Sequence, residues 1–96
     1  MEQKEEGKIL FKIDKYIVEW LNKRNIIIRD TTRSETDNII GYYPRLSQAL
    51  QDFLETISVE RHLADRTISV IRCINDAKLE IVEAVNNIDL DALTAS

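Results

Sequence analysis

The chain has 96 residues, 44% of them hydrophobic and 31% charged, with a formal net charge of −4. This composition is typical of a single globular domain and excludes a disordered chain or one made mainly of membrane spans. The one cysteine, Cys73, excludes an internal disulfide, and the one histidine, His62, adds too few ligands for a zinc site.

The amino-terminal residues 1–7 are mostly charged and have no apolar pattern, so we expect them to be flexible. They lead into no hydrophobic region of a signal peptide, and no apolar run approaches the roughly 18–20 residues that a membrane span needs. We therefore expect a cytoplasmic protein that does not enter a membrane.

Two segments, 8–14 and 16–21, predict β-structure because apolar and polar residues alternate along them. One strand bent near Asp14 and two short strands fit this pattern equally well. The segment 22–25 has asparagine at both ends and predicts a hairpin turn, since asparagine tolerates a left-handed backbone. It leads into a β-branched strand over 26–30.

A polar run from Thr31 to Asp37 predicts a solvent loop, and the segment 38–43 then returns as a strand. The connections between these segments are short, which favours strands that pair in chain order. The front half of the chain, 8–43, therefore predicts an antiparallel β-meander of three to four short strands.

The hydrophobic period changes in the segment 41–50, Gly-Tyr-Tyr-Pro-Arg-Leu-Ser-Gln-Ala-Leu. Apolar residues alternate before this segment and recur every three or four positions after it. Pro44 lacks the backbone N–H of a sheet ladder, so we expect a strand to end at Tyr43 and a helix to begin near Leu46. Because neighbours on a strand point to opposite faces, at least one of Tyr42 and Tyr43 is expected in the core.

A first helix is predicted from Leu46 to about Leu63, because its apolar residues recur at spacings of three and four and form one stripe. A second helix follows, with Asp65 or Thr67 as its N-cap and an end near Asn86. These elements predict an α+β fold.

We expect one domain over 1–96, in which the β-meander precedes two α-helices over 46–88. The last residues, 89–96, are expected to form a weakly ordered tail, since their helical pattern is short.

The second helix carries apolar residues on more than one face. One face should pack on the sheet or the first helix, and further apolar residues add to this stripe: Ile68, Ile71, Cys73, Leu79 and Val82. A domain of this size buries only about 60–65% of its unfolded surface, so an additional buried face would stabilise it. A symmetric partner helix is the simplest cover and predicts a homodimer through the second helix.

The sequence contains no catalytic constellation. His62 has no serine or cysteine beside it in a nucleophile context, and two glycines are too few for a phosphate-binding or dinucleotide-binding loop. We therefore predict a protein that is not an enzyme and that holds no cofactor or metal ion. Its helical neighbours make Cys73 a core residue.

Charge is distributed unevenly between the two halves. From Lys8 to Arg45 there are eight basic and five acidic residues, a balance of +3, whereas from Leu46 to Ser96 there are four basic and nine acidic residues, a balance of −5. Two candidate binding surfaces follow: a basic hairpin and loop made of Lys23, Arg24, Arg29, Arg33 and Arg45, and acidic helix faces made of Asp52, Glu55, Glu80 and Glu83.

The basic surface and the aromatic residues of the same half fit single-stranded nucleic acid, because bases stack on rings and phosphates pair with guanidinium groups. The acidic faces fit a protein whose carboxylates enter a nucleic-acid channel of another protein. A plainer interpretation applies to both surfaces, in which the aromatic residues are core and the charged residues are solvated.

The segment 41–50 resembles the strand-to-helix junction of a group of small proteins of unknown function that are encoded by phages and mobile elements of Gram-positive bacteria. The resemblance extends over roughly residues 16–85. It implies a β-meander followed by two helices, the second introduced by a serine or threonine, a role that Thr67 can fill. It also implies an early-expressed accessory protein that acts inside a bacterial cell, and it implies no active-site residues.

The leading hypothesis is therefore a non-catalytic accessory protein of a phage or mobile element. It would bind a protein partner in a bacterial host, for instance as an anti-CRISPR-like inhibitor of a host defence system. The competing hypothesis is a nucleic-acid-binding accessory or regulatory protein that uses the basic sheet and loop.

Overall fold

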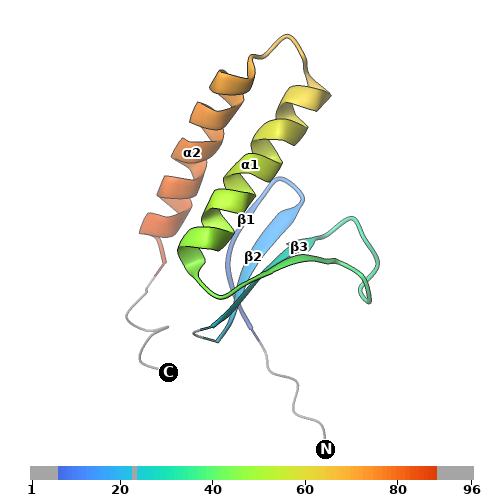
Figure 1. Cartoon of the computed structure of the whole chain (residues 1–96), viewed down its shortest axis with the longest axis vertical. Coiled ribbons are helices and arrows are strands. Elements are labelled where there is room, and N and C mark those ends of the chain that lie inside the picture. The colour runs from blue at the N-terminus through green and yellow to red at the C-terminus, as the bar shows by residue number, and fades with distance from the viewer. Residues whose placement is uncertain (1–6, 23, 89–96) are drawn as a thin grey trace, which may run out of the picture.

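A computed structural model describes residues 7–22 and 24–88 of the chain (Figure 1). The expectations for residues 1–6, for Lys23 and for the tail 89–96 fall outside the described residues. Four strands and two helices follow one another in the order β1 (Lys8–Ile13), β2 (Tyr16–Asn22), β3 (Asn25–Asp30), β4 (Ile39–Tyr43), α1 (Leu46–Ala64) and α2 (Val70–Asn86). This order confirms the predicted α+β fold.

The four strands form one antiparallel sheet in the order β1-β2-β3-β4, which is the predicted meander. Asp14 lies in the turn between β1 and β2 with a φ of 56°, so this part of the chain is two short strands rather than one bent strand. The β2–β3 turn depends on Asn22, whose Oδ1 accepts hydrogen bonds from the backbone N–H of Arg24 (3.0 Å) and from Nδ2 of Asn25 (3.1 Å).

Both helices lie on the same face of the sheet, side by side and antiparallel (Figure 1). α1 packs against β3 and β4, and α2 packs against β1. Near the connection 65–69 the helix pair extends beyond the sheet (Figure 1). In that half α1 still contacts the sheet, since Glu60 accepts a hydrogen bond from Tyr16 and Arg61 donates to Asp14 of the β1–β2 turn.

The core lies between the sheet and the helix pair. Phe53 of α1 is fully buried, and its ring meets the rings of Phe11 and Tyr16 edge to face, with centroids 5.4 Å and 6.2 Å away. The pairing register places Phe11, Val18 and Ile28 beside one another on adjacent strands. The alternation of apolar and polar residues along the strands places these apolar side chains on one face of the sheet, and this face is buried.

The prediction of Asp65 or Thr67 as the N-cap of the second helix is wrong. Ser69 is the N-cap, and its side chain accepts a hydrogen bond from the backbone N–H of Arg72 (3.1 Å). Asp65 instead accepts bonds from the backbone N–H (3.1 Å) and the hydroxyl (2.6 Å) of Thr67, within the connection itself. These bonds lower the pKa of Asp65. Because Asp65 and Thr67 bond to each other within the connection, neither side chain caps the second helix.

Arg61 of α1 connects three elements. Its guanidinium donates from Nε (2.9 Å) and Nη2 (3.1 Å) to the two carboxylate oxygens of Asp14 in the β1–β2 turn, and from Nη1 to Glu80 of α2. Hydrogen bonds to the two carboxylates raise the pKa of Arg61 above its already high ordinary value. Arg61 thereby connects the β1–β2 hairpin to both helices.

Replacement of Arg61 with methionine should lower the free energy of unfolding by about 1–2 kcal/mol, because a bidentate charged contact is lost while its two partly exposed carboxylates remain hydrated. Urea unfolding followed by circular dichroism measures this change. Arg66→Met is the matched control, since Arg66 is exposed and has no hydrogen bond or ion pair with a described residue. Equal effects of the two substitutions would contradict the role assigned to Arg61.

Candidate protein-interaction surfaces

A groove open to solvent runs between α1 and α2 and consists of two adjoining hollows that share Gln51 and Leu54. The hollow nearer the 65–69 connection has a volume of about 180 Å³, and the other about 140 Å³. We call these hollows together the helix groove. Its lining residues are Leu50, Gln51, Leu54, Glu55, Ser58 and Val59 of α1, and Val70, Ile74, Lys78, Ile81 and Val82 of α2.

Small side chains bring the two helices together below this groove. Cys73 and Ala77 of α2 are buried, which confirms Cys73 as a core residue, and Ser58 of α1 is buried as well. The hydroxyl of Ser58 donates to the carbonyl of Leu54 one turn earlier (2.6 Å), so no polar group of this residue is left unpaired. The larger apolar residues beside these small side chains therefore remain at the surface.

Six apolar side chains on and beside the helix groove are between 37% and 72% exposed. Such exposure is unusual when several large apolar residues are neighbours, and it commonly marks a protein interface. The residues concerned lie mainly in the half of the helix pair next to the 65–69 connection: Val59, Leu63, Val70, Ile71, Ile74 and, further along α2, Val82.

A hollow separate from the two of the helix groove, with a volume of about 420 Å³, lies where α1 borders the outer edge of β4. We call it the edge hollow. Tyr42, Tyr43 and Pro44 line it from the strand, and four exposed residues line it from α1: Gln48, Gln51, Asp52 and Glu55. Its wall carries two carboxylates and no basic residue.

Tyr43 forms the wall between the edge hollow and the core. Its hydroxyl donates a hydrogen bond to Asp52, and burial together with this bond raises the pKa of Tyr43 to about 12. A Cβ at Gly41 would collide with the Tyr43 ring, so the glycine is required for this ring to lie over the strand. Tyr42 is 66% exposed, which leaves Tyr43 as the tyrosine that contributes to the core.

The Tyr43 phenol should ionise near pH 12 in the folded protein and near pH 10 in concentrated urea, the ordinary range of tyrosine. Since the pKa is raised on folding, the neutral phenol stabilises the fold below about pH 10, and this contribution is lost as the pH rises towards 12. The difference in phenolate absorbance between wild type and Tyr43→Phe isolates this step. A folded-state step near pH 10 would mean that Tyr43 is not held by burial and Asp52.

The predicted basic residues do not form one surface. Arg29 is half-buried and donates to Glu19 (3.2 Å) and to Asn38 (2.8 Å), and Arg33 lies 3.7 Å from the Asp30 carboxylate. Two of the four described arginines of this set are thus already neutralised by carboxylates. Lys23 lies outside the described residues.

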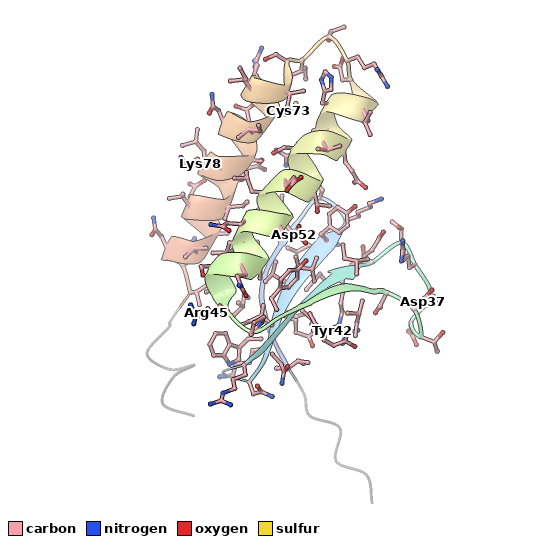
Figure 2. All side chains as sticks on the ribbon, in the orientation of Figure 1. Asp37, Tyr42, Arg45, Asp52, Cys73 and Lys78 are labelled. Atoms are coloured by element: carbon pink, nitrogen blue, oxygen red, sulfur yellow. The ribbon has the colours of Figure 1, made fainter. Side chains whose placement is uncertain are left out.

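The remaining two arginines lie at the opposite end of the sheet from Arg33. Arg24 comes just before β3 and Arg45 just after β4, and since the register pairs Ile26 with Tyr43 both lie at the same end of the sheet. Figure 2 shows Arg45 at the start of α1, far from the loop that carries Asp37 and Arg33. β3 has six residues and therefore spans about 20 Å between these two groups.

The predicted acidic residues also separate into different surfaces. Asp52 and Glu55 come together in the edge hollow, whereas Glu80 pairs with Arg61 beside the β1–β2 turn. Glu83 is exposed on α2 and lines none of the hollows described above. Only Asp52 and Glu55 form a shared site.

The edge hollow was not predicted from the sequence. Its signal was present in the spacing of Gln48, Asp52 and Glu55, which at i, i+4 and i+7 must lie along one flank of a helix. What the spacing cannot show is that this flank borders β4, because that depends on how α1 crosses the sheet.

His62 makes a contact within the fold. Nδ1 of His62 lies 2.7 Å from the carbonyl oxygen of Ile68, so this ring joins the end of α1 to the connection. Within residues 7–22 and 24–88, no three histidine, cysteine, aspartate or glutamate residues come together as metal ligands. No helix in the same part of the chain is long and apolar enough to cross a membrane.

Comparison with protein-family models, with curated proteins and with solved structures finds no match to this chain.

Proposed function

We propose that this chain is a non-catalytic accessory protein of a phage or mobile element that acts by binding other proteins. The helix groove is the observation that carries this proposal. Val59, Val70 and Ile74 line one of its hollows and are 47%, 41% and 37% exposed. Covering such a surface with another protein removes apolar area from water, at about 25 cal/mol per Å².

The first partner is a second copy of the chain, bound through α2. A two-fold axis near Ile74 sets α2 antiparallel to its counterpart, so that Lys78 of one copy lies level with Val70 of the other. Val70 lines the same hollow as Glu55, so each Lys78 approaches a carboxylate of the opposite copy. The arrangement covers apolar side chains and pairs unlike charges at the same time.

The second partner is a host or defence protein with a basic surface, such as a nucleic-acid channel lined by lysine and arginine. The −5 balance of the helical half and the resemblance of the segment 41–50 to phage and mobile-element proteins support this choice. Binding there would make the protein an anti-CRISPR-like inhibitor. A nucleic-acid-binding role has less support, because the basic residues lie on separate surfaces and two of them are paired.

A pull-down with the tagged full chain from a nuclease-treated lysate of a Gram-positive bacterium tests the second partner. We expect one protein at a stoichiometric level. Fluorescence anisotropy with single- and double-stranded DNA at low salt should remain flat. Recovery of no stoichiometric protein, or DNA binding that weakens when Arg24 is replaced with glutamine, would contradict the proposal.

A further inference from the structure

β4 is a free edge of the sheet. It pairs with β3 on one side only, so no described strand meets the backbone groups of its other side. The register with β3 shifts between Ile28 and Arg29, and the pairing then continues through Gly41, Tyr42 and Tyr43. The part of β4 beside the edge hollow is therefore a regular strand whose outer backbone donors and acceptors pair with no strand of the described residues.

The two edges of the sheet differ in charge. β1 carries Lys8 and Lys12, and lysine on an edge strand opposes pairing with another strand. β4 consists of Ile39, Ile40, Gly41, Tyr42 and Tyr43 and has no charged residue. The edge of β4 is therefore the one suited to accept a further strand.

α1 places a row of polar side chains beside this edge. Gln48, Asp52 and Glu55 are separated by about 6 Å and 4.5 Å along the helix axis. Side chains that point to the same face of a strand are about 6.7 Å apart. Because the row and both tyrosines line one hollow, side chains of a strand added to β4 would come close to this polar row.

The charge of the hollow selects the side chains that such a strand would bring. Glu55 has no hydrogen bond or ion pair with a described residue, and Asp52 accepts only the Tyr43 hydroxyl. Tyr42 lines the same hollow and is 66% exposed. A lysine or arginine of such a strand would pair with these carboxylates.

We propose that the edge of β4 binds an extended segment of the partner protein as a fifth strand, with a lysine or arginine of that segment in the edge hollow. The inference rests on the proposed function, since it names the part of a basic protein partner that this chain recognises. Main-chain hydrogen bonds to β4 would supply affinity, and Asp52 and Glu55 would supply the preference for basic segments.

Amide chemical shifts of the isotope-labelled full chain test the inference with three short synthetic peptides. In the first peptide valine alternates with lysine, in the second glutamate replaces lysine, and in the third the first peptide is N-methylated at alternate residues. At millimolar concentration we expect only the first to shift the amides of Ile39–Tyr43 and Gln48–Glu55. N-methylation removes the ladder hydrogen bonds and leaves the charge unchanged.

The variant Asp52→Lys/Glu55→Lys should weaken binding of the lysine peptide by about tenfold or more. Glu83→Lys is the matched control, because Glu83 is an exposed helix carboxylate outside the hollow, and it should change binding by less than about twofold. Binding of the acidic or the N-methylated peptide at the same strength as the first would overturn the inference, as would shifts confined to other elements.

Failure of this inference can be distinguished from failure of the proposed function. If Asp52→Lys/Glu55→Lys still recovers the lysate partner at full yield, partner binding stands and the edge of β4 is not its site. Glu55 also lines the helix groove, so the dimer dissociation constant of the double variant is measured as well. If the double variant loses the partner but dimerises as the wild type does, and Glu83→Lys keeps the partner, the inference is supported in the context of the natural ligand.

Discussion

Replacement of Phe53 with alanine is expected to lower the free energy of unfolding by about 3–5 kcal/mol. Phe53 is fully buried, and its ring meets Phe11 and Tyr16 edge to face between the sheet and α1. The substitution removes these contacts and leaves a cavity that the surrounding strands cannot close. Domains of this size are stable by about 5–15 kcal/mol, so a large part of the stability is lost.

Urea unfolding at neutral pH measures this loss, with circular dichroism as the signal. Phe53→Leu is the control, because leucine keeps most of the volume and should cost clearly less than alanine. If alanine at this position changed the unfolding midpoint no more than leucine does, the packing of α1 on the sheet would have to be different from that described above.

Replacement of Ile74 with aspartate is expected to raise the dissociation constant of the proposed dimer about a hundredfold, or about 2.7 kcal/mol. Ile74 lies at the proposed two-fold axis, so each dimer would bury two unpaired carboxylates next to each other. In the monomer Ile74 is 37% exposed, and the substitution should change the stability of the isolated fold far less. Sedimentation velocity over a dilution series measures the dissociation constant.

Leu79→Asp is the matched control for this effect. Leu79 is 69% exposed on the same helix but lines neither hollow of the helix groove. Five residues separate it from Ile74, which places it about 140° away around the helix axis. A dissociation constant that changes equally in both variants would point to general solubility rather than to the groove.

The elements of this fold follow from local sequence patterns. Alternation and β-branched residues predict three to four strands, Pro44 separates the sheet from α1, and the spacing of three and four predicts both helices. The N-cap of α2 was assigned wrongly because Asp65 and Thr67 satisfy each other within the connection. A sequence pattern does not show which of several capping residues is used locally.

The candidate surfaces were predicted less well, because they depend on contacts between elements that are distant in the sequence. The sequence predicted Arg29 and Arg33 as free basic residues. In the structure, Glu19 lies beside Arg29 and Asp30 lies beside Arg33. In the same way, Glu80 was interpreted as a solvated carboxylate, but the packing of α1 and α2 brings it into an ion pair with Arg61. The excess of apolar residues on α2 could be predicted from the sequence. Periodicity shows that they lie on two faces of the helix, and one helix of a two-layer domain cannot bury both.

The central claim is that the helix groove is a protein interface whose first occupant is a second copy of the chain. Sedimentation equilibrium of the wild-type full chain, from low micromolar to about hundred-micromolar concentration, tests it most directly. The account predicts twice the monomer mass at the upper concentrations, with dissociation on dilution. The monomer mass at every concentration would contradict it.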